Sequence, residues 1–126
     1  MQIFNFSSPS NSRNNKESAL LSLQLEALDP DTPDERLTQL MAHPVAAVRR
    51  AIVRRVHLPN HLADRALVDN DWTVRRAYAQ RGDVSVSHLV RLLQDEHSQV
   101  THWALTHRSL RDTLSQLQDG HKYQLD

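Results

Sequence analysis

Apolar residues recur at helical spacing along most of the chain, and the pattern repeats every 26 residues. Residues 48–55 read VRRAIVRR, and residues 74–81 read VRRAYAQR. Residues 100–107, VTHWALTH, keep the apolar positions and carry threonine or histidine in place of the arginines. A fixed period of roughly 20–50 residues is typical of repeat architectures, in which each repeat is one supersecondary unit.

The period predicts pairs of helices, a longer one followed by a shorter one, joined by tight turns. A leucine-rich helix is expected to begin near Glu17 and to end at Asp29-Pro30. Further helices are expected over residues 33–41, 45–56, 59–67, 72–81, 86–93, 97–107 and 110–117. The candidate N-caps are Thr32, Asp71 and Ser85, and Gly82 is a candidate left-handed C-cap. Because the chain has only two glycines and no hairpin turn signal, it is predicted to be all-α.

Three segments differ in their pattern. Residues 1–16 are rich in serine and asparagine and are predicted to form a flexible leader. Residues 17–118 hold the repeats, and residues 119–126 are predicted to be a frayed tail. The chain is therefore expected to contain one repeat domain with short flexible ends.

Two of the repeat units share a Val-Arg pair, alternate alanines, a leucine-led second helix and an acidic turn. The matching residues are Val48, Arg49, Ala51, Leu58, Pro59, Leu62, Leu67 and Asp69 in one unit, and Val74, Arg75, Ala77, Ala79, Leu89, Leu93 and Asp95 in the next. This pattern resembles the HEAT-like repeats, and especially the leucine-rich repeat variant, over about residues 32–117. The resemblance implies a short right-handed α-solenoid of about four two-helix repeats. A solenoid specifies a surface and not a chemistry.

Composition excludes several classes of protein. Without cysteine the chain has no disulfide, no thiolate metal site and no cysteine nucleophile, and the iron–sulfur segment of some variant-family members has no counterpart. No apolar run approaches the roughly 20 residues of a membrane span, and the first residues do not resemble a secretory signal. A cytoplasmic location without a membrane partner is therefore expected.

The net charge is zero, but the charges are unevenly placed. Residues 17–35 contain six acids and no base, whereas residues 36–91 contain ten arginines and four acids. An uneven distribution of this kind indicates a possible interaction surface more directly than the net charge does.

The first arginine of each Val-Arg pair is predicted to be structural. Arg49 and Arg75 lie about 100° around the helix from the buried valine. From there each can reach an acidic turn, and the candidate partners are Asp69, Asp71 and Asp95.

The second arginine of each pair is the main candidate for partner binding. Arg50 and Arg76 lie on the face that is expected to be wet, His102 continues their column, and Arg54 lies one turn beyond Arg50. Stacked repeats would place these cations roughly 10 Å apart, a spacing suited to an acidic protein segment or to a phosphate backbone. The alternative is a solvated face without a ligand, since arginine is a good helix former.

The two tryptophans are interpreted differently. Trp72 has Ala46 and Ser98 as its column mates, so it is either an exposed anchor for a partner or lies across the neighbouring turn. Trp103 is expected to fill the core of the last repeat. A third basic column, Arg55, Arg81 and His107, is expected to snorkel over its neighbours.

No metal site, cofactor or catalytic group is predicted. His97, His102 and His107 are five residues apart, so they do not share a helical face, and no set of histidines offers the three or four ligands that zinc requires. No phosphate loop, nucleophile elbow or zinc-protease motif is present, and an enzyme is not expected.

The sequence therefore favours a non-enzymatic protein–protein interaction or scaffold module. Its expected partner is a protein or peptide, possibly an acidic one, and the protein itself is expected to be a monomer or a homodimer. Nucleic-acid binding through the arginine columns is the alternative, which the zero net charge and the acidic first helix make weaker.

Overall fold

The computed structural model describes the backbone of residues 9–124 and the side-chain environment of residues 14–118. Every regular element in this part of the chain is a helix, which confirms the all-α prediction. The helices are α1 (Pro9–Leu28), α2 (Asp34–Met41), α3 (Ala46–Val53), α4 (Asn60–Leu67), α5 (Trp72–Ala79), α6 (Val86–Leu92), α7 (Ser98–Leu105) and α8 (Arg108–Gln124).

The predicted period is visible in where the helices begin. Helices α3, α5 and α7 begin at Ala46, Trp72 and Ser98, which are 26 residues apart. Helices α2, α4 and α6 begin at residues 34, 60 and 86, again 26 apart. The chain therefore forms pairs of short helices at the predicted spacing, an arrangement compatible with a helical repeat.

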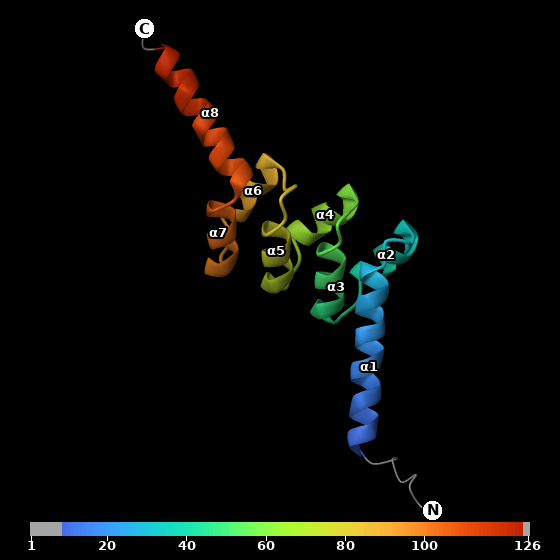
Figure 1. The fold of residues 1–126 in the computed structure, drawn as a ribbon. Coiled ribbons are helices and arrows are strands. Elements are labelled where there is room, and N and C mark those ends of the chain that lie inside the picture. Colours follow the sequence, from blue (N-terminus) through green and yellow to red (C-terminus); the bar gives the residue numbers. More distant parts are fainter. Residues whose placement is uncertain (1–8, 125–126) are drawn as a thin grey trace, which may run out of the picture.

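The helices form two layers. Helices α1, α3, α5 and α7 pack side by side in a row, and α2, α4 and α6 pack along that row between its members (Figure 1). Helix α8 contacts α6 and runs away from the body, and the first turns of α1 project from the opposite end (Figure 1). The two long helices therefore lie at opposite ends of the molecule.

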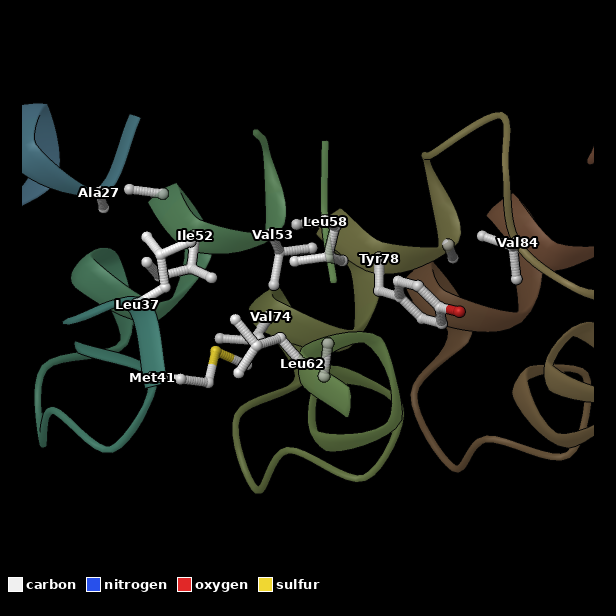
Figure 2. Close-up of a cluster of buried hydrophobic side chains, with 14 of the residues drawn as sticks. Ala27, Leu37, Met41, Ile52, Val53, Leu58, Leu62, Val74, Tyr78 and Val84 are labelled. Carbon is white, nitrogen blue, oxygen red and sulfur yellow. The ribbon is translucent and has the colours of Figure 1, made fainter. Parts of the chain in front are cut away.

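One continuous core runs along the row. Val48, Val74 and Val100, the repeated valines of the sequence pattern, are fully buried. Figure 2 shows the same core passing from one unit to the next, with Leu37 and Val74 among the labelled side chains. Each unit thus buries its apolar face against its neighbours, as expected where no repeat is stable alone.

Two of the predicted helix ends are confirmed and two are wrong. Asp71 caps α5 and Ser85 caps α6, each accepting a hydrogen bond from a backbone N–H of its helix. Thr32 does not cap α2, because its hydroxyl donates instead to the carbonyl of Glu26, 2.6 Å away. No glycine in the described part of the chain has a positive φ, so Gly82 is not a left-handed C-cap.

The long helices extend further than the sequence pattern predicts. Helix α1 begins at Pro9 rather than near Glu17, so part of the expected leader is helical, while residues 1–8 lie outside the described residues. Helix α8 runs to Gln124, through most of the expected frayed tail. Once a helix is nucleated, each added residue costs little, so α1 and α8 extend past the segments that pack. None of the described helices has an apolar stretch long enough to cross a membrane.

Candidate functional site

The first arginine of each Val-Arg pair binds the acidic turn of the following unit. Arg49 donates from Nε and Nη2 to the carboxylate of Asp69, with distances of 2.9 and 3.1 Å. Arg75 repeats this contact with Asp95, at 2.7 and 3.1 Å. The Nη1 atoms donate to the turn that precedes the arginine's own helix, at the carbonyls of His43 and Asp69, both 2.6 Å away. Each guanidinium therefore joins two successive turns.

These ion pairs are largely shielded from water. The Arg75 and Asp95 side chains are 12% and 9% exposed. Burial alone would raise the pKa of Asp95, but hydrogen bonds from Arg75 and from the backbone N–H of His97 outweigh it and lower the pKa. The hydrogen bond to the same carboxylate raises the pKa of Arg75. Both groups are fixed in their charged forms by each other.

Asp71 has a different role from the other two acids of the predicted set. Its carboxylate accepts the backbone N–H of Thr73 at 2.8 Å and the hydroxyl of the same residue at 2.5 Å. The hydroxyl contact is the main reason that the pKa of Asp71 is lowered. Asp71 therefore holds the start of α5 and does not bridge two units.

A second set of contacts between units was not predicted from the sequence. Arg55 donates to the carbonyls of Ala27 and Asp29 at the end of α1, at 2.6 and 2.8 Å. Arg81 does the same at the end of α3, where it contacts the carbonyls of Val53, Arg55 and Val56, the first at 2.7 Å. His107 completes the column with a contact of 2.5 Å between Nε2 and the carbonyl of Arg81.

This column satisfies carbonyls that a helix end leaves without an intrahelical partner. Arg55 and His107 are buried, and neither snorkels over its neighbour as the sequence suggested. The spacing of 26 residues places each basic side chain beside the end of the preceding helix of the row. Basic residues at a constant period, each just after an apolar helix, were the available signal.

The second arginines differ from each other in their contacts. Arg50 is half-buried and donates from Nη1 to the hydroxyl of Thr73 on α5, 2.6 Å away. Arg76, one unit later, has Gln99 in the place of that threonine. Its guanidinium lies over the ring of Trp72, 5.0 Å from the centroid, and makes no hydrogen bond to the described residues. Arg76 is therefore the cation of this column that the fold leaves without a hydrogen-bond partner.

Trp72 lies across the neighbouring turn, the second of its two predicted placements. Its ring stacks on the imidazole of His97 with centroids 3.7 Å apart and planes 8° apart. His97 is the N-cap of α7, where Nδ1 accepts the backbone N–H of Gln99. Trp72 is half-buried between these groups, so it supports Arg76 and is not an isolated exposed anchor.

The remaining members of the predicted partner-binding set are exposed. Arg54 forms no hydrogen bond or ion pair with the described side chains, and His102 contacts only the edge of Trp103, with ring centroids 5.9 Å apart. The sequence analysis overlooked another pair of free cations, Arg65 on α4 and Arg91 on α6, which are 26 residues apart and also exposed. Those two arginines belong to the layer of short helices.

Trp103 does not fill the core of the last repeat. It occupies the column of Ala51 and Ala77, which are 5% and 3% exposed, yet its own side chain is 38% exposed. An indole is too large for a position where two helices of the row approach closely. The ring therefore stays at the surface, beside Gly82 and Arg111 in a shallow pocket.

A hydrogen-bonded chain of three side chains connects α4, α5 and α6. The hydroxyl of Tyr78 lies 2.6 Å from Nδ1 of His88, and Nε2 of His88 lies 3.3 Å from a carboxylate oxygen of Asp64. Burial, followed by the charges of Asp83 and Asp64, raises the pKa of Tyr78 to about 12. A phenol that holds its proton this firmly is a poor nucleophile, so the arrangement acts as a polar link in the core.

No group of three or more histidine and acidic side chains in the described part of the chain could hold a metal ion. No protein-family model, curated protein or solved structure matches this chain. The geometry of its own residues is therefore the basis for a functional proposal.

Proposed function

We propose that this protein is a non-enzymatic protein–protein interaction or scaffold module of the HEAT-like kind. In this proposal its helix pairs form a short right-handed α-solenoid of about four repeats in the cytoplasm. The partner binds the outer face of the row α3, α5 and α7, where Arg50, Arg54, Arg76 and His102 meet it and Trp72 supports them. Stacked repeats offer an extended surface of this kind and little enclosed volume.

The observation that carries the proposal is the state of Arg76. Its neighbour Arg75 is fully used by Asp95 and a carbonyl, whereas the guanidinium of Arg76 is held against Trp72 with its donors unpaired. Stacking on an indole restricts the side chain before binding, and this lowers the entropic cost of forming a new contact. A planar guanidinium with free donors suits a carboxylate, which favours an acidic segment as the partner.

Internal pairing of the arginines argues against the nucleic-acid alternative. Of the ten arginines in residues 36–91, five are bonded to acids or backbone carbonyls of the chain itself: Arg36, Arg49, Arg55, Arg75 and Arg81. The free positive charge is therefore smaller than the sequence count indicates. Nucleic-acid affinity depends on many such charges acting on phosphates together.

Reversing the charge of the outer face tests the proposal. The double variant Arg54→Glu/Arg76→Glu is compared with Arg65→Glu/Arg91→Glu, which changes two exposed arginines of the other layer by the same charge. Proteins captured from native lysate by the wild type and by the control, and lost with the outer-face variant, are the expected result. Circular dichroism establishes that both variants are folded.

Two outcomes would contradict this proposal. Loss of the same captured proteins with the Arg65/Arg91 variant alone would move the binding face to the short helices. Retardation of mixed DNA or RNA fragments near physiological salt, with affinity that falls steeply as salt rises, would favour the nucleic-acid alternative.

A further inference from the structure

Helix α1 carries a row of leucines that nothing in the described structure covers. Leu20, Leu23 and Ala27 face the core. Leu21, Leu25 and Leu28 lie on another side of the helix and are 55%, 61% and 46% exposed. Their spacing of four and then three residues is that of a coiled-coil seam.

Helix α8 carries a second row with the same spacing. Leu110 packs partly against the core, whereas Leu114 and Leu117, further along the helix, are 52% and 65% exposed. An amphipathic helix in water gains most of its stability from packing its apolar face. Both α1 and α8 therefore present a face that a partner helix would stabilise.

The two rows are too far apart to cover each other within one molecule. Helix α1 projects from one end of the body and α8 from the other (Figure 1). Contact between them requires a second copy of the chain, whose α8 can reach the α1 of the first.

Charge favours the pairing of α1 with α8 over the pairing of like with like. Residues 17–35, which include the α1 leucines, contain six acids and no base. The described part of α8 carries Arg108 and Arg111 against one acid, Asp112. Of these, Arg108 is 89% exposed and only 3.9 Å from Asp112 at its nearest polar atom, so the pair is weak. Two α1 helices brought together would place acids against acids, whereas α1 and α8 bring opposite charges together.

We infer that this protein associates with itself head to tail, with the Leu21/Leu25/Leu28 row of one copy packed against the Leu110/Leu114/Leu117 row of another. The association uses none of the five residues assigned to partner binding. A head-to-tail contact is heterologous, so it closes only when two copies pair reciprocally, and otherwise continues into a chain of molecules.

Two single variants, each of which breaks one row, test this inference on the full-length protein. Leu25→Glu places a charge in the α1 row, and Leu114→Glu places one in the α8 row. Val56→Glu, at a fully exposed position in neither row, is the control. Sedimentation equilibrium over a wide concentration range gives the mass of each protein alone and of an equimolar mixture of the two row variants.

The expected pattern is specific to pairing between unlike rows. The wild type and Val56→Glu form dimers or larger species as concentration rises, and each row variant alone stays monomeric. The mixture regains association, because Leu114→Glu supplies an intact α1 and Leu25→Glu supplies an intact α8.

Each other outcome overturns the inference. If Leu114→Glu dimerises alone, the contact joins two α1 helices; if Leu25→Glu does so, it joins two α8 helices. A mixture that stays monomeric excludes the pairing of unlike rows. Wild-type protein that is monomeric at every concentration excludes self-association and leaves the two rows to a different protein.

Discussion

Arg75 on α5 donates two hydrogen bonds to Asp95, which lies twenty residues further along the chain in the turn before α7. A third hydrogen bond from the same guanidinium reaches the carbonyl of Asp69, in the turn before α5. One side chain thus fixes the distance between two consecutive turns. Arg49 makes the equivalent contacts one unit earlier, with Asp69 and His43.

Replacing Arg75 with alanine is expected to lower the free energy of unfolding by about 1–3 kcal/mol, because it leaves the buried Asp95 carboxylate and the Asp69 carbonyl without their donor. Urea unfolding at neutral pH measures the loss. Arg54→Ala is the matched control, since Arg54 is exposed and unpaired among the described residues. Equal stability of the Arg75 and Arg54 variants would show that the ion pair does not stabilise the fold.

The Arg75–Asp95 pair also predicts a dependence of stability on pH. The pKa of Asp95 is lower in the folded protein than in the unfolded chain, so its contribution is complete above the unfolded pKa of about 3.9. The contribution is lost as the pH falls through the folded pKa, where the carboxylate takes up a proton. Asp95→Asn should therefore be less stable than the wild type at pH 7, and the gap should close in acid.

Urea unfolding of the wild type and Asp95→Asn at a series of pH values between neutral and strongly acidic measures this gap. Asp112→Asn is a suitable control, because Asp112 is largely exposed and only weakly paired. A gap that stays constant down to the lowest pH at which both proteins fold would exclude this role for Asp95.

The carbonyl contacts of Arg81 give a separate prediction about α3. Arg81→Ala removes donors from the carbonyls of Val53 and Val56 at the end of that helix. We expect a loss of about 1–3 kcal/mol, as for other buried polar groups left unsatisfied. Amide hydrogen exchange should also speed up in the last turn of α3 more than in α7. Arg91→Ala, at an exposed position, should change neither quantity.

The repeating skeleton could be predicted from the sequence because it follows from local burial. Each buried valine is followed by an arginine, which points toward the acidic turn of the next unit. The contacts of Arg55, Arg81 and His107 were missed because their acceptors are backbone carbonyls, which leave no mark on the sequence. The exposure of Trp103 was missed because it depends on how closely α5 and α7 approach.

The Tyr78–His88–Asp64 chain was also outside the reach of the pattern, since one period earlier the first two positions hold Ile52 and Leu62, which are apolar. It makes a prediction of its own. The pKa of Tyr78 is raised to about 12, against about 10 for a tyrosine in an unfolded chain, because burial disfavours the phenolate. The stability that this phenol contributes is complete below pH 10 and is lost as the pH rises toward 12.

Subtracting the alkaline absorbance titration of Tyr78→Phe from that of the wild type isolates this phenol. The difference is expected to rise near pH 12 while the protein is folded, and near pH 10 in denaturant. His88→Leu serves as a second variant, since it removes the hydrogen-bond partner and keeps the phenol. The raised pKa should persist in it, because burial and not the histidine is the main cause. A normal titration near pH 10 in the folded wild type would show that the hydroxyl is open to water.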